Sequence, residues 1–192
     1  MVIDRILISS EQLHSRVIEL AREIAGRSEG MDLVLVGVLR GAFVFLADLA
    51  RALPATTAID FIAASSYGSG TESNGDVRIT HDLKSPVTGR DVILVEDIVD
   101  TGHTLRALYH HIGAHRPRSL RTCALLSKPS RRIVQIEADW VGFPIPDEFV
   151  VGYGLDFAER FRGLPYLATL KPVVEVRDSA SERNDDFLTL RR

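Results

Sequence analysis

The sequence has one cysteine, Cys123, so the chain can form no internal disulfide bond and no cysteine cluster that would hold zinc. Cys123 lies in an apolar run that ends at Leu126, and a cysteine in such a run is typically a small buried hydrophobe. No apolar stretch approaches the roughly 20 residues that span a bilayer, and the first residues lack the apolar core of a signal peptide. These absences favour a soluble, cytoplasmic protein with no membrane partner.

An excess of either charge is also missing. Lys and Arg together number 23 against 26 Asp and Glu, which gives a formal net charge of −3 and a pI near 6.1. Nucleic-acid binding usually requires a basic field, and the sequence has neither such a field nor a long acidic run. A nucleic acid is therefore not expected as a partner.

What the chain does contain is enough apolar sequence for one sizeable core. With 192 residues and a hydrophobic content of 45%, a single domain is expected. Short apolar segments typical of buried strands alternate with segments whose apolar residues recur at helical spacing. The strand-like segments are 33–38, 59–63, 92–95, 120–126 and 140–143, and the helical ones are 9–26, 42–53 and 105–113. This alternation predicts an α/β fold, in which helices cover both faces of a central, mostly parallel sheet.

The last residues differ in composition from the rest. Residues 177–192 are polar and mixed in charge, which is typical of a segment that cannot bury enough apolar surface to order itself. We expect residues 1–176 to form the domain. Residues 177–192 are expected to be a flexible C-terminal tail, and the sequence assigns them no function.

Three polar or glycine-containing loops follow predicted strands. They are the Arg40-Gly41 pair, residues 65–76 and residues 96–104. Ligands of parallel α/β sheets bind beyond the carboxyl ends of the strands, where all three loops begin. The sequence therefore predicts that the three loops contribute to one site.

The segment Glu96-Asp97-Ile98-Val99-Asp100-Thr101-Gly102-His103-Thr104 gathers the most chemistry. Amides and hydroxyls of residues 101–104, at a helix N-terminus, suit a phosphate, and Gly102 allows close approach. The carboxylates of Glu96 and Asp97 suit ribose hydroxyls or a hard cation such as Mg²⁺. Together these groups describe a site for a phosphorylated sugar. The alternative is that Asp100 and Thr101 only cap a helix while the acidic pair faces water.

The same segment resembles the phosphoribosyl pyrophosphate (PRPP) signature of the type I phosphoribosyltransferases. That signature has two acidic residues, two apolar ones, a third Asp and a Thr/Ser-Gly-x-Thr phosphate loop, and every position is filled here. The likeness extends from Leu7 to Lys171 and is to the hypoxanthine and hypoxanthine-guanine branch of the family. It implies the type I fold, with a small hood formed by terminal segments.

The resemblance also implies a reaction. The chain would act in purine salvage, transferring the 5-phosphoribosyl group of PRPP to hypoxanthine, and also to guanine, to give IMP or GMP and pyrophosphate. The cofactor would be Mg²⁺, and the assembly a homodimer or homotetramer. The sequence leaves the preference between hypoxanthine and guanine open.

Residue roles follow from the same resemblance at the PRPP end. Arg40 and Gly41 match the loop that binds pyrophosphate through backbone amides, and Arg162 matches an arginine that reaches the pyrophosphate. Asp100 is the candidate base for the purine N7 proton. His103 stands at a variable position of the phosphate loop, where it would add a pH-dependent charge.

Further roles follow at the purine end. Lys128 matches a lysine that donates a hydrogen bond to the purine O6, and Phe149 matches the aromatic residue that stacks on the base. Val150 and Asp156 match the positions whose backbone groups contact the edge of the base. Asp156 also matches a magnesium ligand, alongside Glu96 and Asp97. The last correspondence is to the mobile loop that closes over the site, represented here by Ser66 and Tyr67.

Other interpretations have less in their favour. A regulator of the same fold that senses PRPP or a nucleotide would not need the base-reading segment. A dinucleotide-binding oxidoreductase would need a G-x-G-x-x-G motif, which the chain lacks, and there is no P-loop match either. The histidines His110, His111 and His115 include a pair one helical turn apart, but no carboxylate signature accompanies them, so the sequence gives little reason to expect a metal there.

Overall fold

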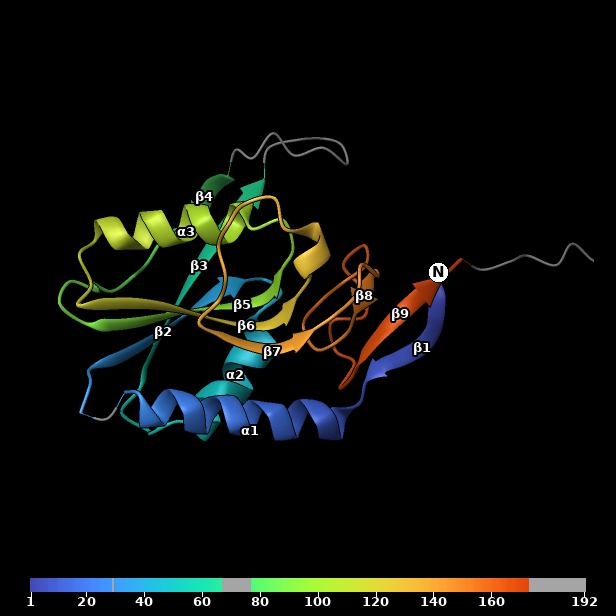
Figure 1. Ribbon diagram of the computed structural model, residues 1–192, viewed down its shortest axis with the longest axis horizontal. Coiled ribbons are helices and arrows are strands. Elements are labelled where there is room, and N and C mark those ends of the chain that lie inside the picture. Colours follow the sequence, from blue (N-terminus) through green and yellow to red (C-terminus); the bar gives the residue numbers. More distant parts are fainter. Residues whose placement is uncertain (29, 67–76, 173–192) are drawn as a thin grey trace, which may run out of the picture.

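The computed structural model describes residues 1–28, 30–66 and 77–172, so Tyr67 and the tail 177–192 lie outside the described residues. A six-stranded sheet has the order β4-β3-β2-β5-β6-β7 (Figure 1). Its strands are β2 (Leu33–Leu39), β3 (Ala58–Ser66), β4 (Val77–His81), β5 (Asp91–Val99), β6 (Ser119–Ser127) and β7 (Trp140–Pro144). All neighbours pair in parallel except β4, which runs antiparallel to β3 at the edge. The predicted α/β class and mostly parallel sheet are confirmed.

Helices cover both faces of this sheet. Figure 1 shows α3 (His103–Ala114) on one face, with α1 (Ser10–Gly26) and α2 (Phe43–Ala52) on the other. Because side chains alternate along a strand, each buried strand supplies both cores. In β2, Leu35 packs in the core with α1 and α2, whereas Val34 and Val36 pack in the core beneath α3. Because β2 contributes side chains to both cores, its sequence is a continuous apolar run, as predicted for a strand buried on both faces.

The start of α1 follows the local signal in the sequence. Ser9 is the N-cap, its side chain accepts a hydrogen bond from the Gln12 amide, and the Gln12 side chain accepts one from the Ser9 amide. This reciprocal pair is a capping box, which satisfies two amides that the first turn leaves without helical partners. The predicted boundaries of α1 and α2 match the observed ones to within a residue.

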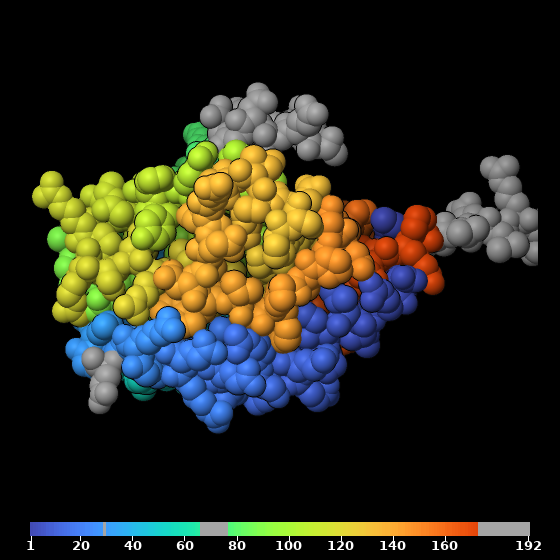
Figure 2. All heavy atoms as spheres, in the orientation of Figure 1, coloured from blue at the N-terminus to red at the C-terminus, as the bar shows by residue number. Residues whose placement is uncertain are grey.

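A second, smaller sheet forms the hood. Its antiparallel strands have the order β1-β9-β8, and they are β1 (Val2–Ile8), β8 (Val150–Val151) and β9 (Leu167–Lys171). The hood lies beyond the ends toward which β6 and β7 point (Figure 1). In Figure 2 the dark blue residues of β1 and the red residues of β9 are in contact at that end of the molecule. Periodicity alone did not identify these short strands, whereas the resemblance implied a hood.

Strand β5 is longer than its apolar run predicted. The expected strand stopped at Val95, yet the pairing of β5 with β6 continues to Val99, which lies opposite Ser127. The acidic pair Glu96 and Asp97 therefore lies within the strand rather than after it. Ladder hydrogen bonds hold the backbone extended even where the side chains become polar, because the neighbouring strand continues alongside.

Cys123 is a free cysteine buried in β6, and burial raises the pKa of its thiol, as for a small hydrophobe in the core. Among the described residues, no helix is both long enough and apolar enough to cross a bilayer.

One buried carboxylate ties the connection after β4 to the sheet. Asp60 in β3 is only 8% exposed, and its Oδ2 accepts hydrogen bonds from the backbone amides of Lys84 and Ser85 at 3.0 and 2.9 Å. Its Oδ1 accepts a third bond, from the Phe61 amide at 2.8 Å. Removing this side chain would leave the three backbone amides without their acceptor.

We predict that Asp60→Ala lowers the free energy of unfolding by about 1 to 3 kcal/mol, because three backbone amides lose their buried acceptor. The matched control is Glu19→Ala, which removes an exposed ion pair with Arg16 and should change stability by less than about 0.5 kcal/mol. Urea unfolding of the two variants and the parent measures both values. Equal losses in the two variants would contradict the assigned role of Asp60.

Candidate active site

A cavity of about 590 Å³ lies at the carboxyl ends of the parallel strands, between the main sheet and the hood. The ends of β2, β3, β5 and β6 contribute to its wall, as do residues from the hood segment. Predicted site residues among its lining are Arg40, Gly41, Glu96, Asp97, Asp100, Thr104, Lys128, Phe149, Val150, Asp156 and Arg162. The fold thus brings eleven residues that are widely separated in sequence to one cavity.

A smaller cavity of about 220 Å³ continues this site toward the start of α3. Thr101 and Gly102 line it, and it shares Glu96, Asp100 and Thr104 with the larger cavity. Because α3 begins here, the free amides and the positive end of its dipole favour an anion at this position. The combined site therefore has an anion-binding end beside a group of carboxylates.

Some predicted site residues are not brought into these cavities. His103 lines neither one, and its Nδ1 is buried without a hydrogen-bond partner among the described residues. The His103 side chain thus lies outside both cavities, although its backbone belongs to the first turn of α3, and its predicted role at the phosphate stays a prediction. Ser66 ends β3, and Tyr67 lies outside the described residues, so the predicted loop closure stays a prediction.

Gly102 has a backbone role in addition to the close approach of a phosphate, which stays a prediction. The sequence suggested that its missing side chain allows a phosphate to approach closely. In the structure Gly102 is the N-cap of α3 with φ of +90°, a conformation that favours glycine. A Cβ atom there would lie 3.0 Å from Ile136 and 3.2 Å from the carbonyl oxygen of Val134. Glycine is thus required by the backbone turn and by packing against the 134–136 segment.

The acidic pair of β5 is set into the wall of the cavity. Glu96 is 5% exposed, and burial, reinforced by the charge of Asp97, raises its pKa well above the usual value. Burial also raises the pKa of Asp97 to about 6, with a further contribution from Asp156. Carboxylates held this close together with little water favour a bound cation or hydroxyl donors. The alternative that the pair simply faces water is wrong.

A glycine permits the acidic pair to lie against the neighbouring loop. A Cβ atom on Gly41 would lie 1.5 Å from Oδ2 of Asp97, so no other residue fits without moving the carboxylate. Gly154, which follows β8 of the hood and has φ of +105°, also packs closely, because a Cβ atom there would lie 2.1 Å from the carbonyl oxygen of Gly41. The peptide bond between Leu39 and Arg40 is cis. The Arg40-Gly41 loop is therefore in direct contact with both β5 and the hood.

The two arginines of the site are balanced by acids. Nη2 of Arg162 lies 2.7 Å from Oδ1 of Asp156, and Nη2 of Arg40 lies 2.6 Å from Oε1 of Glu159. Arg162 also donates to the carbonyl of Gly154 at 2.8 Å. Glu159 was not predicted, because nothing in the sequence distinguishes it from an exposed acid. Both arginines lie where an anionic ligand could replace their present partners.

Asp100 does not cap α3, since the N-cap is Gly102 and no side chain caps that helix. Its Oδ1 instead accepts a hydrogen bond from Nε of Arg131 at 3.0 Å. Arg132 donates to the backbone carbonyl of Asp100 and, at 2.9 Å, to the hydroxyl of Ser127. Sequence reasoning missed these two arginines, which follow Lys128 closely and have the appearance of an ordinary polar loop.

The other end of the cavity combines a flat apolar side chain with a buried cation. Phe149 is 56% exposed, and its ring packs edge to face on Phe157 with the centroids 5.7 Å apart. Lys128 is only 8% exposed, and its Nζ lies 3.5 Å from Oδ1 of Asp147. An open aromatic face suits a planar ligand, and a buried ammonium beside it suits a hydrogen-bond acceptor on that ligand.

Comparisons with known proteins agree with this geometry. The sequence matches the family described as the phosphoribosyl transferase domain over residues 9–158. It is 49% identical over 178 residues to the hypoxanthine-guanine phosphoribosyltransferase of Mycobacterium avium, covering 90% of this chain and 88% of that protein. It is 48% identical over 164 residues to the hypoxanthine phosphoribosyltransferase of Escherichia coli K12, covering 84% and 92%.

A solved structure gives the same result in three dimensions. The hypoxanthine-guanine phosphoribosyltransferase of Bacillus anthracis superposes with a TM-score of 0.85 at 49% identity, covering 88% of this chain and all of that one. The resemblance that the motif at residues 96–104 indicated is thus confirmed by sequence and by fold.

The raised pKa of Asp97 gives a pH-dependent stability without added ligands. The folded state holds this proton up to about pH 6, whereas an unfolded aspartate releases it near pH 4. Folding therefore binds protons in this interval, and stability falls as the pH rises through it. Asp97→Asn cannot ionise, so we predict that its stability relative to the parent increases between about pH 5 and about pH 8.

Thermal unfolding at the two pH values, in the absence of Mg²⁺ and substrates, measures this difference. Asp4→Asn is the control, because Asp4 lies on β1 and its partner is Lys171 of β9, far from the carboxylates of the cavity. A difference between Asp97→Asn and the parent that does not change with pH would contradict the pKa assigned to Asp97.

Proposed function

Because the chain belongs to the family of the phosphoribosyl transferase domain, we propose that it is a purine salvage enzyme that transfers the 5-phosphoribosyl group of PRPP to hypoxanthine. Guanine is a second substrate, and the products are IMP or GMP and pyrophosphate. The main support for this proposal is that two adjoining cavities, which share Glu96, Asp100 and Thr104, connect the start of α3 to the ring of Phe149 and the ammonium of Lys128. Those two ends match the two ends of a purine nucleotide.

The PRPP end is assigned from the groups around the acidic pair. The 5′-phosphate binds the amides and hydroxyls of residues 101–104 at the start of α3, where the helix dipole favours its charge. The ribose hydroxyls lie near Glu96 and Asp97. The pyrophosphate binds the backbone of the Arg40-Gly41 loop and the guanidinium of Arg162, which then exchanges its partner Asp156 for the ligand.

Magnesium is the cofactor that these residues fit. The carboxylates of Asp156, Asp97 and Glu96 all line the large cavity, and an all-oxygen donor set suits this hard cation. The raised pKa of Asp97, which burial and the charge of Asp156 produce, supports the assignment, because a cation would relieve that unfavourable environment. When bound, magnesium would neutralise charge on the pyrophosphate.

The purine end is assigned from stacking and one hydrogen bond. The base stacks on Phe149, and Nζ of Lys128 donates to the purine O6. Backbone groups at Val150 and near Asp156 contact the edge of the base. Lys128 is buried beside Asp147, so its ammonium is held in place before the base binds. These groups recognise a 6-oxopurine and leave the choice between hypoxanthine and guanine to contacts at C2.

The chemical step requires stabilisation of charge rather than a covalent nucleophile. Breaking the bond from C1 to pyrophosphate places positive charge on the ribose and negative charge on the leaving group. Arg162 and the Arg40-Gly41 loop stabilise the leaving group, and the carboxylates of β5 face the ribose. Asp100 accepts the proton from N7 of the purine. Arg131 holds one oxygen of that carboxylate, which fixes its orientation.

A homodimer or homotetramer is proposed as the assembly, and light scattering on the purified chain measures it. The cytoplasmic location and the absence of a nucleic-acid partner stay predictions from the sequence. The relatives are named as transferases and give no support to a regulatory protein of the same fold.

A base panel tests the proposed function. With PRPP and Mg²⁺, we predict pyrophosphate release with hypoxanthine and guanine, and a kcat/KM with adenine at least about 100-fold lower. The reason is that the ammonium of Lys128 can donate to an O6 oxygen but finds no acceptor in the amino group of adenine. Excess EDTA should abolish release if magnesium is the cofactor.

Lys128→Met tests whether the Lys128 ammonium causes the discrimination against adenine. Lys84→Met is the matched control, because Lys84 is an exposed lysine away from the cavity. The first variant should lose most of the preference for hypoxanthine over adenine, and the second should keep it. Turnover of adenine at the rate of hypoxanthine by the parent would defeat the assignment of a 6-oxopurine substrate.

Asp100→Asn tests the proton acceptor. Asparagine keeps the shape of the side chain but cannot take the N7 proton, so we predict a loss of about 10² to 10⁴ in kcat. Binding of PRPP should change little, because the phosphate contacts residues 101–104. Stability should also stay near that of the parent, since Asp100 does not cap α3. Steady-state kinetics, PRPP titration and a melting curve measure the three quantities, and near-parental kcat would remove Asp100 from the mechanism.

A further inference from the structure

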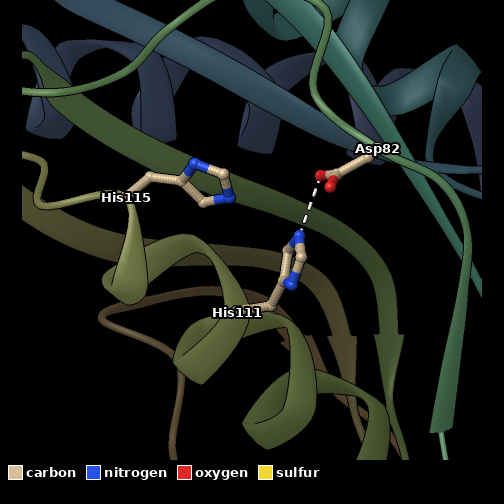
Figure 3. A group of neighbouring side chains, drawn as sticks. All are labelled: Asp82, His111 and His115. Carbon is tan, nitrogen blue, oxygen red and sulfur yellow. Dashed lines mark hydrogen bonds and ion pairs between the residues drawn. The ribbon is translucent and has the colours of Figure 1, made fainter.

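Three side chains with metal-binding atoms meet at the far end of α3 from the active site. His111 lies in the last turn of α3 and His115 just after it, whereas Asp82 follows β4. One ligand atom from each residue lies within 4.8 Å of the others. Figure 3 shows the carboxylate of Asp82 facing the ring of His111, with the His115 ring turned toward the same space. The sequence has no carboxylate signature near these histidines, and the fold brings Asp82 to them from a separate segment.

The backbone and neighbouring groups already hold these side chains near one another. Nε2 of His111 lies 2.8 Å from Oδ1 of Asp82, and the same oxygen accepts a hydrogen bond from the Leu83 amide at 2.8 Å. The centroids of the two imidazole rings are 5.3 Å apart. The hydroxyl of Thr88 donates to the carbonyl of His115 at 2.8 Å, which fixes the backbone at the end of the helix.

We propose that Asp82, His111 and His115 form a binding site for a divalent transition-metal ion of the zinc type. Two imidazoles and one carboxylate are a donor set that Zn²⁺ prefers, with water as the fourth ligand. His115 is the C-cap residue four positions after His111, a spacing that brings the two rings to one side of the helix end. Mg²⁺ is a poor candidate, because it requires mainly oxygen ligands.

The distances fit such an ion after side-chain rotation. Ligand atoms of a tetrahedral ion, each bound at about 2.0 to 2.2 Å, lie about 3.3 to 3.6 Å apart. The widest separation among the three ligand atoms, at most 4.8 Å, therefore has to contract by up to about 1.5 Å, and the 2.8 Å contact between His111 and Asp82 has to open by about 0.5 to 0.8 Å. Asp82 and His115 are exposed and His111 is partly exposed, so rotation of the side chains can supply this contraction and the ion can reach the site.

The proposed site would connect two separate parts of the chain. Leu83 and Ile79 from the β4 region pack in the same core cluster as Leu108 and Ile112 of α3. An ion bound by Asp82, His111 and His115 would add a direct link between that region and the end of the helix. Binding to the folded chain alone raises stability by mass action, so the melting temperature should increase with the concentration of the ion.

Calorimetric titration of the untagged full chain with Zn²⁺, in excess Mg²⁺ to occupy oxygen-rich sites, tests the proposal. We expect one Zn²⁺ ion per chain. Asp82→Asn, His111→Ala and His115→Ala should each weaken binding at least about tenfold. His110→Ala is the matched control, because His110 is an exposed histidine of the same helix turn outside the cluster. It should bind Zn²⁺ as the parent does.

Melting curves with and without Zn²⁺ give a second readout, which does not depend on catalytic activity. The parent and His110→Ala should be stabilised by the ion, and the three ligand variants should not. Melting without metal shows whether each variant folds. The proposal is overturned if the parent binds no Zn²⁺, or if the three ligand variants bind and are stabilised as well as the control.

Discussion

The close packing of Gly41 on the carboxylate of Asp97 is the contact on which the site depends. Strands β2 and β5 are adjacent and parallel, with Gly37 opposite Val95, so their carboxyl ends finish side by side. A side chain on Gly41 would overlap Oδ2 of Asp97. Because glycine stands there, the arginine loop after β2 and the acidic pair of β5 can line the same cavity. Gly154 extends the contact to the hood, which carries the purine end of the site.

Without a ligand, the charged groups around this contact are buried or paired with one another. Burial raises the pKa values of Glu96 and Asp97, while Arg40 and Arg162 are held by Glu159 and Asp156. The two arginines therefore have partners that the phosphates of a phosphorylated sugar could replace, and the two buried carboxylates lie where a hard cation would relieve their repulsion. Groups held in position before the ligand arrives need little reorganisation when charge develops, which is the basis of electrostatic catalysis.

The sequence predicted the parts of the molecule that local signals control. The capping box at Ser9 and the apolar periodicity of α1 and β2 follow from short-range preferences, and the motif at residues 96–104 was recognisable as a unit. It did not predict the full length of β5, because the neighbouring strand rather than local preference keeps Glu96 and Asp97 extended. The contact between Asp100 and Arg131 and the meeting of Asp82 with His111 depend on tertiary structure, so nothing local could indicate them.

We expect the phosphate end and the base end of one nucleotide to occupy the two adjoining cavities of this site. A crystal structure of the chain with IMP and Mg²⁺ tests this arrangement most directly. We predict the 5′-phosphate at the amides of residues 101–104, with the purine ring on Phe149 and its O6 within hydrogen-bond distance of Nζ of Lys128. A nucleotide bound elsewhere, or bound here with its phosphate beside Lys128 and its base at the start of α3, would overturn this assignment.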